Sequence, residues 1–175
     1  KPPIWRRIQV PENYNFWQLH VAIQDAMGWY DCHLHQFKND PKTGFEVKIG
    51  MSEDIEYDED VISEQTAKIK KYFTSSNNKA LYEYDFGDDW QHNILLEKIL
   101  PATKAEDYPV CIAGKRKCPP EDCGGIWGYK DLLTVMNDSD APEYEEKMEW
   151  LGEGFDPEKF HPKSVIFTHR KQGDL

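Results

Sequence analysis

The stretch from Leu81 to Glu97 constrains the fold most, because two strand-forming runs flank one short turn. Aromatic and apolar side chains alternate with polar ones on both sides of that turn, at Tyr82, Tyr84 and Phe86 and then at Trp90, His92, Ile94 and Leu96. Alternation of this kind is typical of half-buried strands, and the Gly-Asp-Asp sequence between the runs favours a tight reversal. The stretch therefore predicts a β-hairpin.

A helix is predicted over Phe16–Met27. Asn15 can cap its first turn, and Gln18 lies three residues further on, which is the spacing of a capping box. Apolar residues recur at helical spacing along the segment, and Gly28 supplies a C-terminal stop. We expect this helix to cover one face of a sheet.

The rest of the chain predicts further strands, C-terminal helices and one irregular stretch. Strands are expected at 4–10, 33–37 and 45–49 with a turn at 40–44, helices from about Gly128 and after Pro142, irregular chain at 111–125, and a last strand at 165–167. The predicted class is α+β: an antiparallel, roll-like sheet of hairpins packed by one main N-terminal helix and C-terminal helices. At this length we expect a single domain over residues 1–175.

Charge and composition exclude several classes of protein. The net charge of −11 argues against a nonspecific nucleic-acid binder, because phosphate contacts need a basic face. No apolar run is long enough to span a bilayer, and with no secretory signal we expect a cytoplasmic protein with reduced thiols. The acidic segment at 53–60 is expected to be a solvated loop, with calcium binding as the alternative. The chain begins at Lys1 in strand-like sequence without a Met, which leaves room for an upstream strand.

The hairpin turn carries the first candidate site. Asp85, Asp88 and Asp89, with His92 on the second strand, could bind a divalent metal or act as acid and base. A metal-dependent hydrolase would use Asp85, Asp88 and His92. The alternative is turn chemistry, because aspartate readily bonds its own backbone in such turns.

A second candidate site uses cysteine and histidine. Zinc prefers these ligands, and the chain offers three cysteines in one stretch, two histidines at strand spacing and one on the hairpin: Cys111, Cys118, Cys123, His33, His35 and His92. The cysteine spacing lacks the tight pair of most zinc ribbons and fingers, so structural thiols and packing histidines are the alternative. Any metal, zinc or another divalent ion, is predicted to join this loop to the hairpin. His20 is expected to be a packing histidine inside the helix.

The loop from Cys118 to Gly125 precedes a predicted helix and could bind a ligand. Its candidate residues are Glu121, Asp122, Gly124 and Gly125, with Trp90 as an aromatic wall. Backbone amides at a helix N-terminus favour anions, but the two carboxylates in the loop oppose that.

Several ordered motifs are spread along the chain: Pro3-Ile-Trp-Arg-Arg-Ile, Phe16-Trp-Gln-Leu-His with Trp29, His33-Leu-His, Tyr84-Asp-Phe-Gly-Asp-Asp-Trp-Gln-His, Cys118-Pro-Pro-Glu-Asp-Cys-Gly-Gly and Phe155-Asp-Pro. Together they resemble the plasmid pRiA4b ORF-3-like family from Pro2 to about Phe167. The resemblance implies an α+β, roll-like domain of prokaryotic cytoplasmic proteins, sometimes linked to mobile elements, with no established biochemical function.

Three functions remain open at this point. The first is a cytoplasmic binding or interaction module for a protein or small molecule, with its site at the hairpin turn (Asp85–His92) and the loop Cys118–Gly125. The second is the metal-dependent hydrolase using Asp85, Asp88 and His92. The third is a DNA-binding accessory protein linked to mobile elements.

Overall fold

The computed structural model describes residues 3–38, 47–51, 61–103 and 107–168. The turn predicted at 40–44 and the acidic segment at 53–60 lie outside the described residues.

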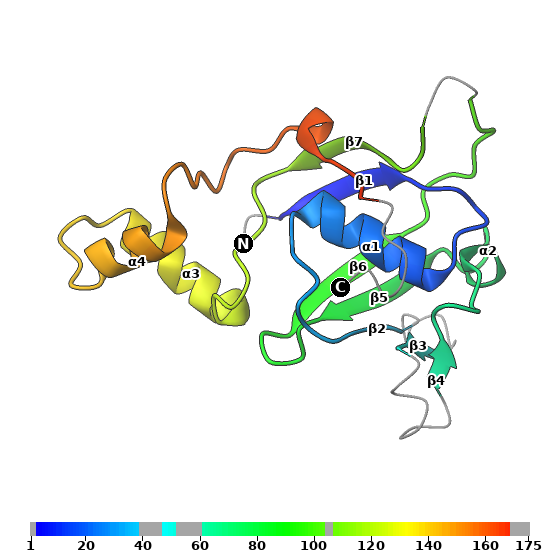
Figure 1. Cartoon of the computed structure of the whole chain (residues 1–175), viewed down its shortest axis with the longest axis horizontal. Coiled ribbons are helices and arrows are strands. Elements are labelled where there is room, and N and C mark those ends of the chain that lie inside the picture. Colours follow the sequence, from blue (N-terminus) through cyan, green and yellow to red (C-terminus); the bar gives the residue numbers. More distant parts are fainter. Residues whose placement is uncertain (1–2, 39–46, 52–60, 104–106, 169–175) are drawn as a thin grey trace.

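The main sheet has five strands in the order β4-β3-β2-β5-β6 (Figure 1). In chain order the strands are β2 (His35–Lys38), β3 (Lys48–Gly50), β4 (Val61–Ser63), β5 (Lys79–Tyr84) and β6 (Trp90–Leu95). All neighbours are antiparallel except β3 and β4. The predicted β-hairpin is confirmed as β5 and β6, in which Tyr84 pairs with Trp90 and Tyr82 with His92.

A second, two-stranded sheet pairs β1 (Trp5–Gln9) with β7 (Val110–Lys115) in antiparallel register. The prediction of an irregular stretch at 111–125 was therefore wrong for its first part. Its glycine and prolines suggested a loop, but hydrogen bonds from a strand about a hundred residues away fix residues 110–115 as a strand. Long-range pairing of this kind leaves no signal in the local sequence.

Helix α1 (Phe16–Met27) has the predicted bounds. The Asn15 side chain accepts a hydrogen bond from the Gln18 backbone N–H, and the Gln18 side chain accepts one from the Asn15 N–H, so the capping box is complete. Gly28 ends the helix with a φ of 87°, in the left-handed region.

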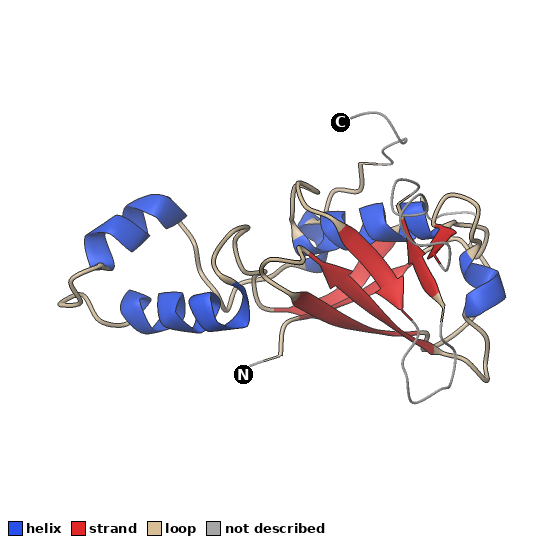
Figure 2. Cartoon of the chain, turned by 90° about the horizontal axis from the view of Figure 1, so that it is seen from below, coloured by secondary structure: helices blue, strands red, loops and turns tan. Residues whose placement is uncertain are grey.

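The core lies between α1 and one face of the five-stranded sheet (Figure 2). The Phe16 and Phe37 rings meet edge to face with centroids 4.9 Å apart. Tyr82 and Tyr84 of β5 are fully buried on this face. Aromatic side chains from the helix and the central strands thus hold the two layers together.

The C-terminal part forms a helical hairpin, α3 (Gly125–Met136) and α4 (Tyr144–Leu151), which projects away from the sheets (Figures 1 and 2). Two short elements, α2 (Ile69–Tyr72) and η3 (Pro162–Ser164), complete the described structure. Helix α3 begins three residues before the predicted start. The strand predicted at 165–167 was wrong, because this segment pairs with no sheet edge and has no regular structure.

The α+β class is confirmed, with largely antiparallel sheets and one main N-terminal helix. The five-stranded sheet stays open. Within the described ranges, no helix is both long and apolar enough to cross a membrane.

Candidate metal centre at the hairpin turn

Three loops meet at the end of the β5–β6 hairpin. They are the 28–34 loop between α1 and β2, the 85–89 turn, and the 118–125 loop before α3. The Trp29 indole N–H donates to the Pro119 carbonyl at 3.0 Å, which joins the first loop to the third. The Asp85 N–H donates to the Leu34 carbonyl at 2.9 Å, which joins the first loop to the turn.

The turn and the 118–125 loop also touch directly. The Gly124 N–H donates to Asp88 Oδ2 at 3.1 Å. Gly125 packs so closely on the Asp88 carbonyl that a Cβ added there would lie 2.3 Å from that oxygen. The predicted residues Asp88, Gly124 and Gly125 thus form the contact between two walls of the site.

Asp85 uses its two carboxylate oxygens differently. Its Oδ1 accepts hydrogen bonds from the Gly87 and Asp88 backbone N–H groups at 2.9 and 3.2 Å, which stabilises the turn. Its Oδ2 faces His33, with His33 Nε2 3.6 Å away. Turn chemistry and a ligand role, proposed as alternatives from the sequence, are therefore compatible in this residue.

His33 lies at the centre of the site. Its Nε2 lies within ion-pair distance of Asp122 Oδ1, at 3.0 Å, but forms no hydrogen bond with any of the described residues. The nitrogen is nonetheless buried. Buried polar atoms in proteins nearly always have a partner, so an unbonded imidazole nitrogen between two carboxylates needs an explanation.

Glu121 presents a second buried atom without a partner. Its Oε1 accepts hydrogen bonds from the Tyr30 backbone N–H at 2.9 Å and the Tyr84 hydroxyl at 3.0 Å. Its Oε2 is buried and has no hydrogen-bond partner in the part of the chain that the structure describes. As in Asp85, one oxygen anchors the carboxylate and the other remains available.

The ligand atoms form two overlapping groups that share His33. In one, His33, Asp85 and Asp122 each offer an atom within 4.8 Å of the others; in the other, Cys32, His33 and Glu121 do so. Nitrogen, oxygen and sulfur donors together suit zinc, whose ligands lie about 2.0–2.3 Å from the ion. Each group therefore brings together three atoms of the kind that bind such an ion.

Cys32 would have to lose a proton to bind a metal. Cys32 is exposed, but partial loss of solvent around its thiol raises the pKa above the ordinary value, and the nearby Glu121 carboxylate raises it further. The Tyr84 hydroxyl lies 3.9 Å from Cys32 Sγ and opposes that shift. A cation would supply the positive charge that stabilises the thiolate.

Four aspartates in the three loops have left-handed backbone: Asp31 at φ 61°, Asp85 at φ 56°, Asp89 at φ 53° and Asp122 at φ 55°. Aspartate tolerates this region better than most residues, but it remains a sparsely populated conformation for any side chain except glycine. Such conformations persist only where surrounding contacts enforce them, and they are concentrated at functional sites.

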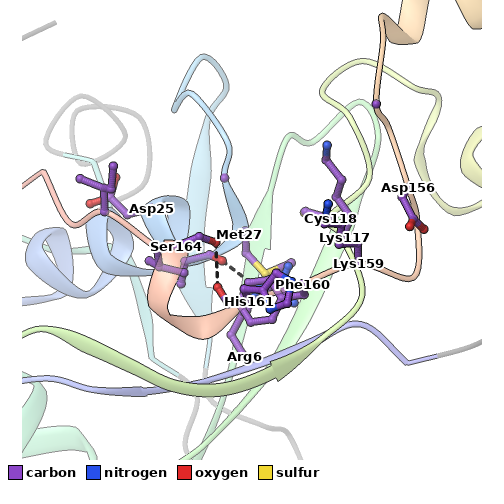
Figure 3. Close-up of a pocket in the computed structure, with 15 residues that line it drawn as sticks. Arg6, Asp25, Met27, Lys117, Cys118, Asp156, Lys159, Phe160, His161 and Ser164 are labelled. Carbon is purple, nitrogen blue, oxygen red and sulfur yellow. Dashed lines mark hydrogen bonds between the residues drawn. The ribbon is translucent and has the colours of Figure 1, made fainter.

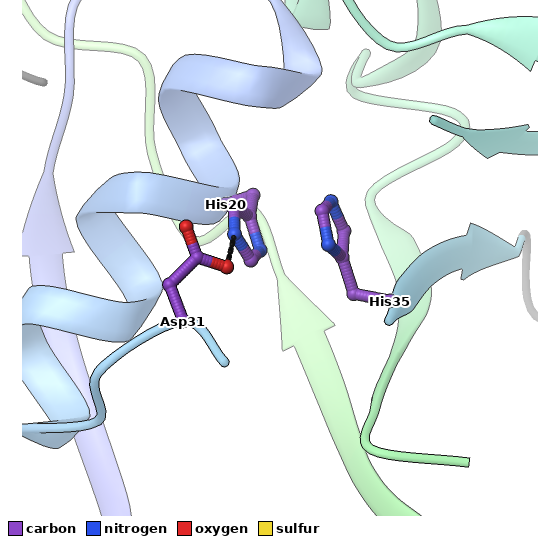
Figure 4. Close-up of side chains that lie close together, drawn as sticks. All are labelled: His20, Asp31 and His35. Atoms are coloured by element: carbon purple, nitrogen blue, oxygen red, sulfur yellow. Dashed lines mark hydrogen bonds and ion pairs between the residues drawn. The ribbon is translucent and has the colours of Figure 1, made fainter. Parts of the chain in front are cut away.

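Behind the site lies a buried polar network (Figure 4). Gln24 donates to the Tyr82 hydroxyl at 2.9 Å. Because the Asp31 carboxylate can only accept from one ring nitrogen of His20, the other, Nδ1, accepts from the Tyr82 hydroxyl at 2.8 Å when the ring is neutral. The opposite ring nitrogen, His20 Nε2, then carries the proton and donates to Asp31 Oδ1 at 2.7 Å. Burial lowers the pKa of His20 to about 4, so the ring is neutral near pH 7. His20 is the packing histidine that the sequence predicted.

His35 stacks on His20 with centroids 3.4 Å apart and planes 6° from parallel, and its Nε2 bonds Glu64 at 2.7 Å. The lone pairs of two parallel rings lie in separate planes and cannot both point at an ion between them. His20, Asp31 and His35 therefore form a structural network in this arrangement, although their ligand atoms lie close together.

Of the other candidates on the hairpin, Trp90 is buried and His92 is half-buried beside it. Trp90 belongs to the hydrophobic core, and His92 packs edge to face on Trp29 with centroids 5.2 Å apart. Burial lowers the pKa of His92 to about 4. Among the described residues, Asp85, Asp88 and His92 form no cluster that could hold an ion, so the geometry does not assemble the hydrolase site.

Cys111, Cys118 and Cys123, the cysteines that the sequence offered as zinc ligands, lie in surroundings that favour the protonated thiol. Cys111 lies on β7, and burial raises its pKa. Burial also raises the pKa of Cys118 well above its ordinary value, and raises that of Cys123 to about 12 with help from Asp88. Cys118 lines a separate pocket of about 410 Å³ next to Arg6 (Figure 3). Within the described residues, none of the three belongs to a metal-type cluster.

Arg6 forms one wall of that pocket and ties several elements together. Its guanidinium donates to the Ala26 carbonyl at 2.8 Å and to the Trp5 and Lys115 carbonyls at 2.9 and 3.1 Å. The group also lies 3.6 Å above the Phe160 ring. These contacts link β1 to the end of α1 and to β7, which is a structural role.

The structure brings some of the residues that the sequence offered as ligands together and leaves others apart. His33, Asp85, Glu121 and Asp122 come together where the hairpin meets the 118–125 loop. His35, His92 and the three loop cysteines do not join them. Cys32 was missed, although its position directly before His33 was a usable signal.

The fold and site define a small α+β protein with a mixed imidazole, carboxylate and thiol cluster between three loops. A sequence model described as plasmid pRiA4b ORF-3-like protein matches residues 1–164, and the chain belongs to this family. The resemblance drawn from the motifs is thereby confirmed.

Two relatives illustrate the family. The "Uncharacterized protein y4hQ" of Sinorhizobium fredii (strain NBRC 101917 / NGR234) is 31% identical over 152 residues, covering 87% of this chain and 75% of the relative. The crystal structure of the protein of unknown function MM3350 from Methanosarcina mazei Go1 is 54% identical and covers 95% of this chain and 92% of its own, with a TM-score of 0.88. Both are described as uncharacterised or of unknown function, so neither supports a hydrolase or another specific role.

Proposed function

We propose that this protein is a binding module that holds one divalent metal ion, with zinc as the first candidate, where the β5–β6 turn meets the 118–125 loop. His33, Asp85 and Asp122 form the principal ligand set, and Cys32 and Glu121 flank it. The observation that carries the proposal is that two buried ligand atoms, His33 Nε2 and Glu121 Oε2, have no hydrogen bond among the described residues. A cation between them would satisfy both atoms and offset the repulsion among the carboxylates.

One side of this site is open. The Asp122 side chain is 71% exposed, whereas that of Asp85 is 10% exposed. A metal held by three protein ligands keeps a free coordination position, which water or a donor atom of another molecule can occupy. The open side supports a role in binding a small molecule or a partner protein through the metal.

A reducing compartment suits this site. All four cysteines are free thiols, and Cys32 is exposed. In an oxidising compartment an exposed thiol is prone to oxidation, which would remove it as a metal ligand. We therefore place the protein in the cytoplasm.

Zinc titration calorimetry on untagged, metal-free protein tests the proposal. We expect one equivalent to bind, and His33→Ala and Asp122→Asn each to weaken binding at least about tenfold, the equivalent of roughly 1.4 kcal/mol. His161→Ala is the matched control, because His161 is an exposed histidine outside the site. Failure to bind zinc, or equal loss in the control, would overturn the proposal.

A further inference from the structure

The α3–α4 hairpin exposes large apolar side chains. Ile126 is 63% exposed, Trp127 is 78% exposed and Trp150 is 53% exposed. Helix α4 has no buried residue along its whole length. Exposed tryptophans on a projecting element are a recognised mark of interaction surfaces, because tryptophan is strongly enriched among the residues that dominate binding energies.

The two tryptophans lie at the same end of the hairpin. Lys147 of α4 forms an ion pair with Asp131 of α3, which fixes how the helices face each other. Trp127 lies four residues before Asp131 and Trp150 lies three residues after Lys147, so each is about one turn from the ion pair. Because the helices run in opposite directions (Figure 2), both steps lead towards the root of the hairpin near Gly125.

The charge of the hairpin indicates what could cover this surface. Residues 125–153 contain eight acidic and two basic side chains, which gives a formal charge of −6. Both lysines are engaged, Lys147 with Asp131 and Lys130 with its Nζ 5.7 Å from the Trp127 ring centroid. The Lys130 contact also shows that the exposed indole face already attracts a cation.

The negative charge of the α3–α4 hairpin argues against most kinds of binding partner. Nucleic acid and anionic membrane surfaces would be repelled, and two copies joined through this face would bring together two surfaces of formal charge −6. A basic segment fits the charge, and apolar side chains on that segment fit the tryptophans. A helix suits two antiparallel helices best, because it can pack along them as a third.

We propose that the α3–α4 hairpin is a docking surface for a basic amphipathic helix of a partner protein, anchored by Trp127 and Trp150. The surrounding glutamates steer the basic face of that helix, and the indoles bury its apolar residues. This inference does not depend on the metal centre, because the two sites use different side chains.

A fluorescence anisotropy titration of the whole protein with a labelled peptide tests the proposal. The probe is a peptide of leucine and lysine about 18 residues long, with leucines at helical spacing, and a scrambled peptide of the same composition is its control. At about 0.1 M salt we expect the helical peptide to bind at least about tenfold more tightly than the scrambled one.

Substitutions distinguish anchoring of the peptide by the two tryptophans from simple attraction between its lysines and the acidic hairpin. We expect Trp127→Ala and Trp150→Ala each to weaken binding at least about tenfold, while the matched control Trp5→Ala on β1 leaves it unchanged. Glu145→Gln with Glu149→Gln should weaken binding by a factor that shrinks at high salt. Equal binding of both peptides, tryptophan variants that bind like the unmodified protein, or absence of binding would each overturn the proposal.

Discussion

The His33 imidazole and the Asp122 carboxylate lie 3.0 Å apart, nitrogen to oxygen, without forming a hydrogen bond. Asp122 is held there by a left-handed backbone conformation, and His33 by the short loop that leads into β2. Two groups brought this close and left unbonded have the arrangement that a bound cation would complete.

The two roles of Asp85 can be separated by substitution. Asp85→Asn keeps an oxygen that can accept the Gly87 and Asp88 hydrogen bonds but removes the negative charge that faces His33. We expect a free energy of unfolding within about 0.5 kcal/mol of the unmodified protein and clearly weaker zinc binding. Urea unfolding and zinc calorimetry measure the two effects.

Asp85→Ala should lose both the turn hydrogen bonds and the contribution of Asp85 to zinc binding. It removes the oxygen that accepts the turn hydrogen bonds and places alanine at a φ of 56°. The free energy of unfolding should therefore fall by about 1–3 kcal/mol. If the asparagine variant were as unstable as the alanine variant, the carboxylate charge itself would be what the turn requires, which contradicts the assigned roles.

Gly125→Ala should separate the two walls of the site. The added Cβ would meet the Asp88 carbonyl oxygen at 2.3 Å, and the φ of 63° adds strain. We expect a loss of about 2 kcal/mol or more in unfolding free energy together with weaker zinc binding. Gly152→Ala is the matched control, because its φ of 72° is similar but nothing lies within 4 Å of its added Cβ. It should lose only about 1 kcal/mol and bind zinc normally; weakened zinc binding in this control would count against the specific role of Gly125.

The reactivity of the Cys32 thiol should report whether zinc is bound at the proposed site. Its raised pKa predicts slow alkylation by iodoacetamide near pH 7 in metal-free protein, because the thiolate is the reactive form. We expect zinc to slow the reaction further at Cys32, and mass spectrometry of peptides identifies the modified cysteine. Cys32→Ser should weaken zinc binding less than His33→Ala, since His33 belongs to both ligand groups and Cys32 to one. Unchanged alkylation with saturating zinc would place Cys32 outside the coordination sphere.

Acid should destabilise the protein through its buried histidines. The pKa values of His20 and His92 fall from 6.5 to about 4 on folding, so the unfolded state binds protons first as pH drops. Their contribution to stability is therefore complete above about pH 6.5 and is lost progressively towards pH 4, by up to about 3 kcal/mol for each ring.

Urea unfolding between pH 7 and pH 4.5 measures this dependence. His92→Gln should flatten the profile, whereas His161→Gln, at an exposed position, should leave it unchanged. A stability that stays constant or rises as the pH falls to 4.5 would contradict the burial of two neutral rings.

Helix α1 and the β5–β6 hairpin could be predicted from the sequence, because residues close together in the chain determine them. The capping box at Asn15 and the stop at Gly28 determine α1 from a few adjacent residues, and alternation predicted β5 and β6. Strand β7 was missed because its partner β1 lies far away in the chain. Proximity in the sequence cannot reveal such pairs.

The sequence named most residues of the candidate site but could not show which of them lie together, for the same reason. His33 and His35 have strand spacing, but β2 begins at His35, so His33 lies in the preceding loop and faces the turn while His35 faces the core. The loop cysteines lie in packed surroundings, which the spacing of cysteines alone does not show. Only the meeting of three loops selects Glu121 and Asp122 as partners of His33.

Anomalous diffraction at the zinc edge from crystals of the zinc-loaded protein tests the central claim most directly. The account predicts one strong peak about 2.0–2.2 Å from His33 Nε2, with carboxylate oxygens of Asp85 and Asp122 in the same coordination sphere. Zinc bound elsewhere, or no peak beside His33 at full zinc loading, would contradict it.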